Sequence, residues 1–240
     1  MRVAIYQDYV HNHGSLAMAL QDRGIQYAFF DADMIISGAL SMVDLLIMPG
    51  GADLFYCEKL NGEGNDEIRT FVENGGGYLG ICAGAYYACA QLDWNKGEIA
   101  GSRELAFIDA TATGPVFDYI LDGDIEKSWY AAVDLTWGEQ TFATLYEGGP
   151  LFDGAKDVTV YASYDRGAAV IGKSVGKGQV VLSSPHIEIN ADAFARGRYK
   201  HRNTSPDYEL FVADELSGDV DAQNAFFDFI LNIFEPVEHS

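Results

Sequence analysis

The pattern of hydrophobic and polar positions changes period repeatedly over the first hundred residues. Short apolar runs, typical of buried strands, alternate with longer segments in which apolar residues recur every three or four positions, typical of helices. Strands that alternate with helices predict a parallel sheet covered by helices on both faces. The predicted strands span 2–6, 25–30, 44–51 and 78–81, and the predicted helices span 14–23, 63–74 and about 83–92.

The middle of the chain, about 99–175, follows a different pattern. Short β-prone pieces are separated by Gly, Pro and Asp, which predicts hairpins appended to the sheet and not a second domain with its own core. An apolar run at 179–189 returns to a buried strand, and 220–234 forms an amphipathic helix. We therefore expect a single domain over 1–240. The β-prone pieces are AFIDATATG, AAVDLTW, TFATLYEGG, VTVYASY and AAVIGKSV.

Composition narrows the function classes. Hydrophobic residues make up 48% of the 240 residues, which suffices for a sizeable core. The net charge of -21 argues against nucleic-acid binding and against docking on anionic membranes. Three cysteines without a CxxC pair make a disulfide framework or a structural zinc site unexpected, and a reducing compartment fits best. With no signal-peptide core and no apolar run of about 18 residues, we expect a soluble cytoplasmic protein.

One glycine-rich stretch, GGGYLGICAGAYYACAQ at 75–91, carries the first candidate for chemistry. A strand, then Gly-Ile-Cys-Ala-Gly, then helix formers is the pattern of a nucleophile elbow, which raises Cys82 above the end of the strand. Gly80 and Gly84 would allow the strand and helix to pack closely. Amides at the helix start, beginning with Ala83, favour a thiolate and can receive an oxyanion.

The alternative for Cys82 is a buried small hydrophobic residue, which is the commoner role of a free cysteine. Cys57 and Cys89 are interpreted in this way. Cys57 has no base motif of its own, and Cys89 is placed on the core side of the helix over 83–92.

A second glycine turn, in LIMPGGAD at 46–53, follows another buried strand. Ligands of an open α/β sheet bind where the carboxyl ends of strands meet, and both glycine turns lie at such ends. A main-chain NH of Gly50 or Gly51 could supply the second oxyanion donor. Alone, this stretch could equally be an ordinary turn.

The third element is SSPHIEI at 183–189. His186 follows a buried strand, and Glu188 lies two residues on, so both side chains project to one side if the segment is extended. A carboxylate beside an imidazole fixes its tautomer and supports its cation. The other four histidines, His11, His13, His201 and His239, lack such a partner after a buried strand.

Further residues are predicted to bind substrate. The segment 53–65 is interpreted as a substrate-shaping loop that contributes Asp53, Tyr56 and Glu58, the alternative being a solvated connection to the next helix. Tyr86 is predicted to line the same pocket, or else to pack the helix against the sheet.

The order of these motifs resembles the class I glutamine amidotransferase-like superfamily. More closely, residues 48–89 resemble the amidotransferase-like domain at the N-terminus of eukaryotic biotin-protein ligases, which also occurs as a stand-alone bacterial protein. The resemblance implies a flavodoxin-like three-layer α/β/α sandwich with a mostly parallel sheet, and a Cys82–His186–Glu188 triad.

Two departures from that resemblance limit what carries over. Glutamine-hydrolysing members usually show GxCxGxQ, whereas this chain has Tyr86 at the last position, which argues against glutamine as the substrate. The basic cluster RGRYKHR at 196–202 lacks the surrounding glycines of a biotin-ligase adenylate loop, so biotin ligation is not expected.

The residues therefore support a cysteine hydrolase or amidotransferase-like enzyme acting on a C–N bond of a small amide, with no metal or organic cofactor. Ammonia transfer would need a partner synthetase or domain, and the hairpins of 99–175 could build a homodimer. The main alternative is a non-catalytic binding or regulatory module whose partner is a biotin-related or other biosynthetic protein. A third option, the peptidase and deglycase branch of the superfamily, needs a carboxylate upstream of the cysteine and ranks below.

Overall fold

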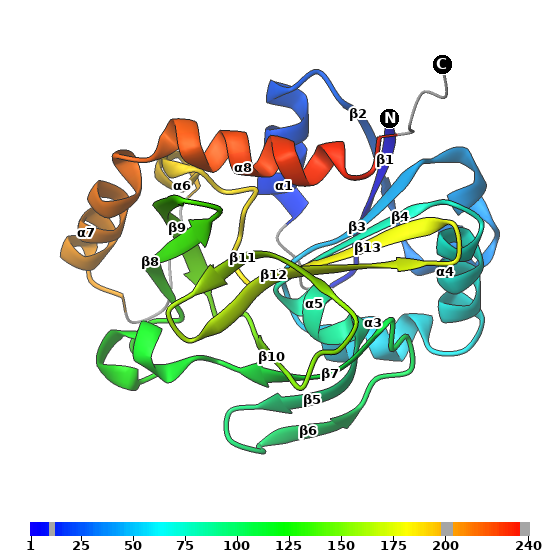
Figure 1. Cartoon of the computed structure of the whole chain (residues 1–240), viewed down its shortest axis with the longest axis horizontal. Helices are drawn as coiled ribbons and strands as arrows, with labels where there is room; N and C mark the ends of the chain where they lie inside the picture. Colours follow the sequence, from blue (N-terminus) through cyan, green and yellow to red (C-terminus); the bar gives the residue numbers. More distant parts are fainter. Residues whose placement is uncertain (10–12, 198–203, 236–240) are drawn as a thin grey trace.

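Two β-sheets organise the chain in the computed structural model, which describes residues 1–9, 13–197 and 204–235. The larger sheet has nine strands in the order β2-β1-β3-β4-β13-β12-β11-β8-β9 (Figure 1). Its first five strands are mutually parallel. They are β2 (Gln26–Phe30), β1 (Arg2–Tyr6), β3 (Leu45–Met48), β4 (Gly77–Ile81) and β13 (Gly178–Ser183).

Four antiparallel strands extend this parallel half. They form two hairpins, so the predicted appended hairpins are confirmed for these segments. Pairing between β8 and β9 runs from Tyr130 opposite Glu147 to Trp137 opposite Gln140, so Glu147 lies at the end of the hairpin away from its turn. The strands are β12 (Gly167–Val175), β11 (Thr159–Tyr164), β8 (Tyr130–Trp137) and β9 (Gln140–Glu147).

Helices cover both faces of the parallel half, because side chains along each buried strand alternate between the two faces. In β1, Val3 and Ile5 pack with α1 (His13–Asp22) and α8 (Val220–Asn232), whereas Ala4 and Tyr6 pack on the other side. This other face is covered by α2 (Ala32–Ile36), η1 (Ala39–Met42), α3 (Asp53–Leu60), α4 (Glu63–Glu73) and α5 (Ala83–Ala88). The predicted three-layer α/β/α sandwich is confirmed (Figure 1).

Two more helices pack at the antiparallel end of the sheet. The helices α6 (Ala191–Arg196) and α7 (Pro206–Ser217) share an apolar cluster with Tyr130 of β8 and Leu145 of β9. Sequence patterning left 190–218 unassigned, and residues 198–202 of the basic cluster lie outside the described residues. Two short 3-10 helices, η2 (Phe117–Tyr119) and η3 (Leu121–Gly123), precede β8.

A second, four-stranded sheet was not predicted. Its order is β10 (Leu151–Asp153), β7 (Ile108–Gly114), β5 (Cys89–Trp94) and β6 (Ile99–Ser102). The predicted helix over 83–92 is therefore wrong beyond Ala88, and Cys89 begins a strand. The physical reason is pairing at a distance: β5 runs parallel to β7, with Cys89 opposite Ile108, and this partner cannot be seen from local periodicity.

The prediction of a loop over 53–65 is also wrong. Residues Asp53–Leu60 form α3, and α4 begins at Glu63. Tyr56 and Leu60 are one helical turn apart and both fully buried, so α3 is fixed by packing more than by its weakly apolar sequence.

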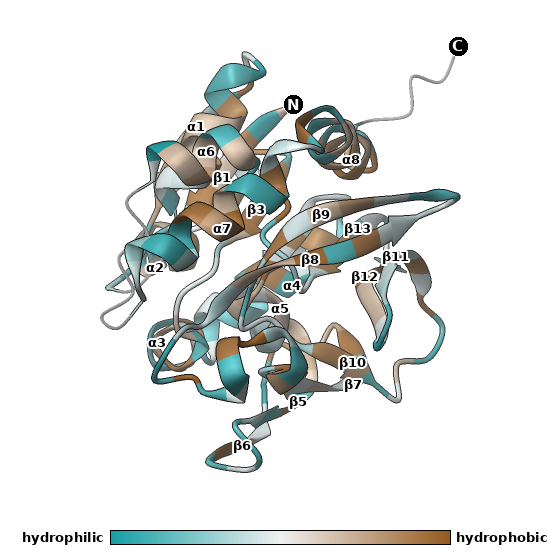
Figure 2. Ribbon diagram, turned by 90° about the vertical axis from the view of Figure 1, so that its left-hand side faces the viewer, coloured by the Kyte–Doolittle hydropathy of each residue, from teal (hydrophilic) through white to brown (hydrophobic). Residues whose placement is uncertain are grey.

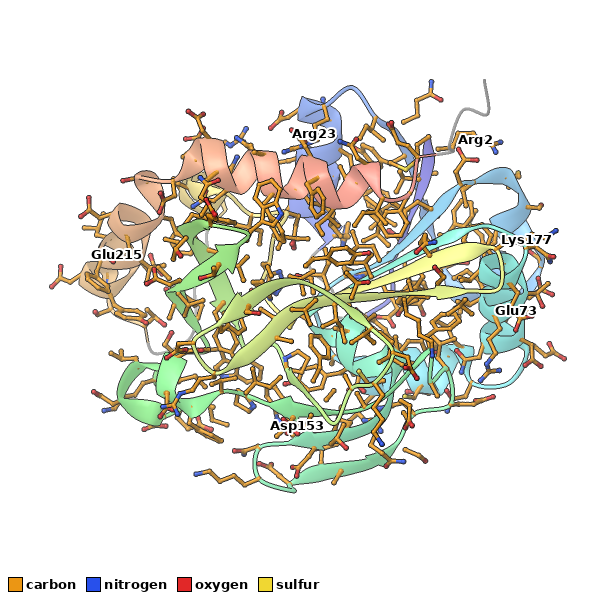
Figure 3. All side chains as sticks on the ribbon, viewed as in Figure 1. Arg2, Arg23, Glu73, Asp153, Lys177 and Glu215 are labelled. Carbon is orange, nitrogen blue, oxygen red and sulfur yellow. The ribbon has the colours of Figure 1, made fainter. Side chains whose placement is uncertain are left out.

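Charged side chains lie at the surface of the molecule, and hydrophobic residues lie mainly inside it. Figure 2 shows the hydrophobic stretches mainly on the strands and on the inward sides of helices. The labelled charged side chains Arg2, Glu73, Lys177 and Glu215 lie at the edges of the molecule in Figure 3 and are exposed. None of the helices in the described part of the chain is long and apolar enough to cross a membrane.

The close approach of α5 to the sheet depends on two glycines. A Cβ atom on Gly84 would lie 2.1 Å from the Met48 carbonyl oxygen, and one on Gly80 would lie 2.5 Å from the Gly84 carbonyl oxygen. No side chain fits at either distance, and the obstacle in each case is backbone. The sequence-based expectation that side chains would collide here is confirmed.

We expect Gly84→Ala to lower the free energy of unfolding by about 3 kcal/mol, because overpacking against backbone costs roughly 1–3 kcal/mol or more. The matched control is Gly14→Ala, on the exposed side of α1, where an added Cβ meets nothing within 4 Å. This control should leave stability unchanged or slightly raised. Urea unfolding followed by circular dichroism measures both, and equal stabilities for the two variants would contradict the assigned packing.

Candidate active site

Cys82 sits on a sharp turn between β4 and α5. Its backbone has φ +50° and ψ −105°, a conformation that a residue with a side chain rarely adopts. The turn is held from both directions: the Cys82 amide donates to Ser183 O at 2.8 Å, and the Cys82 carbonyl accepts from Ala85 N at 2.9 Å. Surroundings that over-determine a strained backbone are common at functional sites.

His186 lies just after β13, within the loop that follows the strand. Its amide donates to Leu145 O at 2.9 Å, and its carbonyl accepts from Ile189 N at 3.0 Å, so residues 186–189 form a turn. The expectation of an extended segment is therefore wrong. The turn still brings the two side chains together, with Nδ1 of His186 2.8 Å from Oε1 of Glu188.

Burial and charge act in opposite directions on His186, which is fully buried. Burial alone would lower its pKa, since it disfavours the imidazolium. The charge of Glu188, together with hydrogen bonds to Cys82 and Glu188, outweighs burial and raises the pKa of His186 well above its usual value. The imidazolium form is therefore favoured at neutral pH beside the Cys82 thiol.

A second carboxylate, Glu147, approaches the same imidazole and was not predicted from the sequence. Its Oε2 lies 3.6 Å from Nε2 of His186, and its backbone carbonyl accepts from Cys82 Sγ at 3.3 Å. Glu147 ends β9 and is followed by Gly148 and Gly149. A strand that ends in two glycines is the same signal that singled out the PGG turn. This signal could have identified Glu147 from the sequence.

A cavity of about 360 Å³ opens beside these groups. The predicted residues Gly51, Asp53, Cys82, Ala83, Tyr86 and His186 all line it. Glu188 lies behind His186, and Gly50, Tyr56 and Glu58 are absent from the lining. The remaining lining residues are Ala52, Leu54, Leu92, Trp94, Ile99, Trp129, Glu147 and Gly148.

The residues that do not reach the cavity have identifiable positions. Tyr56 is buried, and its hydroxyl donates to Pro49 O at 2.9 Å, so it supports the glycine turn from below. Glu58 is on the exposed side of α3, 3.8 Å from the ammonium of Lys59. The Gly50 carbonyl accepts a longer bond from the Tyr56 hydroxyl, at 3.3 Å.

Asp53, at the start of α3, is held by a buried arginine that sequence patterning missed. Arg103 follows β6, and its Nε donates to the Asp53 carboxylate. Burial raises the pKa of Asp53, and the bond and charge of Arg103 oppose that rise. The pair joins α3 to the second sheet and fixes one wall of the cavity.

Tyr86 fills the position at which the superfamily motif usually has Gln. Its side chain is 3% exposed, its hydroxyl donates to Gly148 O at 3.0 Å, and its ring meets Trp94 edge-on at 5.7 Å between centroids. Tyr86 therefore lines the cavity and also ties α5 to the residue that follows β9.

A larger hollow of about 590 Å³ lies at the opposite ends of the strands, beside Asp44, Gly77 and Gly178. Ligands of open α/β sheets bind at the carboxyl ends of strands, where Cys82 lies, so chemistry is assigned to the smaller cavity. Among the described residues, no three His, Cys, Asp or Glu side chains are grouped so as to hold a metal ion. All three cysteines are free.

Comparison with known proteins agrees with the fold. A crystal structure described as a glutamine amidotransferase superposes with a TM-score of 0.60 at 21% identity, over 88% of this chain and 98% of that one, so the two share a fold. The chain belongs to the family described as biotin-protein ligase, N terminal, whose model matches residues 31–235.

Individual relatives match shorter stretches. An uncharacterized protein of Chlamydia muridarum is 40% identical over 60% of this chain and 60% of its own length. The biotin–protein ligase of Schizosaccharomyces pombe is 35% identical over 62% of this chain but only 26% of its own length. The pyridoxal 5'-phosphate synthase subunit PdxT of Haloquadratum walsbyi is 29% identical over 65% of this chain and 71% of its own.

The strain at Cys82 gives a stability prediction. Cys82→Gly should be more stable than Cys82→Ala by about 1 kcal/mol, because glycine removes a strain of roughly 1–3 kcal/mol but adds about 0.5–1 kcal/mol of unfolded-state entropy. At Cys89, where φ is −82°, the same comparison should reverse. Thermal or urea unfolding of the four variants measures these differences. If the Gly and Ala variants ranked in the same order at both positions, the strain at Cys82 would be contradicted.

The carboxylate partner of His186 gives a prediction on its charge. Glu188→Gln should lower the pKa of His186, because the opposite charge that raises this pKa is removed and burial then dominates. Histidine ring NMR at neutral pH should show an imidazolium in the native protein and a neutral ring in the variant. Glu58→Gln removes an exposed carboxylate and should change nothing. A protonated ring in Glu188→Gln would assign the raised pKa to another group.

Proposed function

We propose that this protein is a cysteine-dependent hydrolase or amidotransferase-like enzyme that acts on the C–N bond of a small amide. The single observation that carries the proposal is the meeting of Cys82, on a strained elbow, with the buried His186–Glu188 pair at one cavity. Nucleophile, base and orienting carboxylate within reach of one another are the mark of covalent catalysis. The whole chain would act as one such domain.

In the proposed reaction the Cys82 thiolate attacks the amide carbonyl carbon and forms a C–S bond. His186, held as imidazolium, gives its proton to the leaving nitrogen as the C–N bond breaks. Water then attacks the thioester while His186 takes one of its protons. The C–S bond breaks and the carboxylic acid leaves, which returns Cys82 to the thiolate and His186 to the imidazolium. Glu188 fixes the imidazole through Nδ1 throughout.

Two backbone amides are assigned to the oxyanion. Within the first turn of α5, the amide of Gly84 donates to Pro49 O at 3.2 Å, and those of Ala85 and Tyr86 donate to Cys82 O. The Ala83 amide, at the cavity, is therefore the one assigned to a substrate oxygen. Gly51 also lines the cavity, and its φ of +148° suits a glycine that brings its backbone close to a ligand.

The lining favours a small amide other than glutamine. Tyr86 occupies the motif position of the usual glutamine, with its hydroxyl already bonded to Gly148. A cavity of about 360 Å³ is at the small end of the range for ligand sites. No metal or organic cofactor takes part in the proposed steps.

A partner enzyme or domain is part of the proposal only if the released ammonia is transferred. Relatives named as subunits of pyridoxal 5'-phosphate synthase make such a partnership reasonable. The ligase relative matches over only 26% of its length, so biotin ligation is not proposed for this chain. Three free cysteines suit a reducing compartment, and the cytoplasm is proposed as the location.

Thiol labelling tests the nucleophile. With limiting iodoacetamide at neutral pH, Cys82 should react at least about tenfold faster than a cysteine in an unfolded peptide, because an adjacent histidine activates a nucleophilic cysteine. Cys57 and Cys89 serve as internal comparators: burial raises the pKa of Cys57 to about 11, and burial raises that of Cys89 further. Peptide mass spectrometry locates the label.

The fast reaction should vanish in Cys82→Ser and fall at least about tenfold in His186→Ala. Ammonia release from a panel of small amides, with glutamine included, should show the same dependence on Cys82. Labelling of Cys82 no faster than an unfolded cysteine would favour a non-catalytic binding or regulatory module.

A further inference from the structure

The proposed reaction leaves one carboxylate of the cavity without a role. Glu147 and Glu188 approach opposite nitrogens of the same imidazole, at 3.6 Å and 2.8 Å. The Glu188 side chain is completely buried, whereas that of Glu147 is 19% exposed and lines the cavity. Glu147 is therefore the carboxylate that an incoming ligand can touch.

Aromatic rings form much of the wall near this carboxylate. Trp94 lies 5.7 Å from Trp129 and 5.7 Å from Tyr86, measured between ring centroids. Trp129 is 36% exposed and lines the cavity, so a ligand there can reach its ring. Aromatic rings together with a carboxylate form the arrangement that proteins use to bind ammonium groups.

Apart from the His186 imidazolium, the charged side chains that line the cavity are carboxylates. Among the described lining residues there is no lysine or arginine. The second lining carboxylate, Asp53, is paired with Arg103. The net charge of -21 adds a long-range attraction for cations.

His186 also faces this point of the cavity. Its buried Nε2 has both Cys82 and the Glu147 carboxylate as neighbours. Glu147, at 3.6 Å, competes with Cys82 for this nitrogen. A cation bound to Glu147 would weaken that competition and leave the imidazolium to the Cys82 thiolate.

We propose that Glu147 is a specificity-determining residue, which selects an amide carrying an ammonium group and holds that group between its carboxylate and the Trp94–Trp129 wall. The inference rests on the proposed function only in naming an amide as the bound molecule. The binding of a cation beside Glu147 does not require Cys82 to react.

The experiment therefore uses Cys82→Ala, in which binding is separated from chemistry. Choline chloride and its neutral isostere 3,3-dimethylbutan-1-ol are titrated at constant ionic strength, and tryptophan fluorescence reports binding. Trp94 and Trp129 line the cavity, whereas Trp137 packs against Phe226 and Phe229 and gives a constant background. The dissociation constant of the cation should be at least about tenfold lower than that of the alcohol, a difference of about 1.4 kcal/mol.

Glu147→Gln in the same background should abolish the difference between the two probes. Glu58→Gln removes one negative charge from the exposed side of α3 and should preserve it, which separates the local contact from net charge. Trp129→Leu offers a second test, at a lining side chain that is partly exposed. It should weaken choline binding more than alcohol binding.

Equal binding of the two probes would overturn the inference. So would an equal loss of choline selectivity in Glu147→Gln and Glu58→Gln. Selective choline binding in a protein whose Cys82 labels slowly would uphold the cation site and defeat the proposed enzyme. Rapid Cys82 labelling without probe selectivity would support the proposed enzyme and overturn the cation site.

Discussion

The site depends on how the first turn of α5 is clamped between two parallel strands. The Cys82 amide donates to Ser183 O at the end of β13, and the Gly84 amide donates to Pro49 O just beyond β3. These two bonds tie the elbow to the strands on either side of β4. They form only because position 84 is glycine, since any Cβ there would strike the Met48 carbonyl. The strain at Cys82 is thus offset by hydrogen bonds to the ends of two buried parallel strands.

This clamp also explains why three sequence motifs meet. In a parallel sheet the carboxyl ends of adjacent strands share one edge, so the chain leaving β3, β4 and β13 must emerge side by side. The motifs PGG, GICAG and PHIE each follow one of these strands. Their convergence could be predicted from short-range signals, because each strand is marked by its own apolar run.

The parts that could not be predicted depend on pairing between distant segments. Trp94 reaches the cavity because β5 pairs with β7, and Glu147 because β9 sits at the end of a hairpin whose last strand closes over Cys82. The local periodicity of hydrophobic residues predicts neither arrangement. The same limitation made residues 89–92 look helical and α3 look like a loop. Arg103, paired with Asp53 from the far side of the second sheet, was invisible for the same reason.

The two carboxylates around His186 are chemically identical, but their different environments give them different interactions with the imidazole. Glu188 is sealed from solvent and makes a direct bond of 2.8 Å, so its charge is scarcely screened and serves to hold the imidazolium. Glu147 is farther away and partly solvated, so its attraction to the ring is weaker and can be exchanged for another partner. Tyr86 also affects which residues a ligand can contact. By filling the helix side of the pocket it shifts the remaining contacts to Trp94, Trp129 and Glu147, which come from outside the parallel half of the sheet. In the proposed enzyme the elbow therefore sets the kind of reaction, and the added strands set what can reach it.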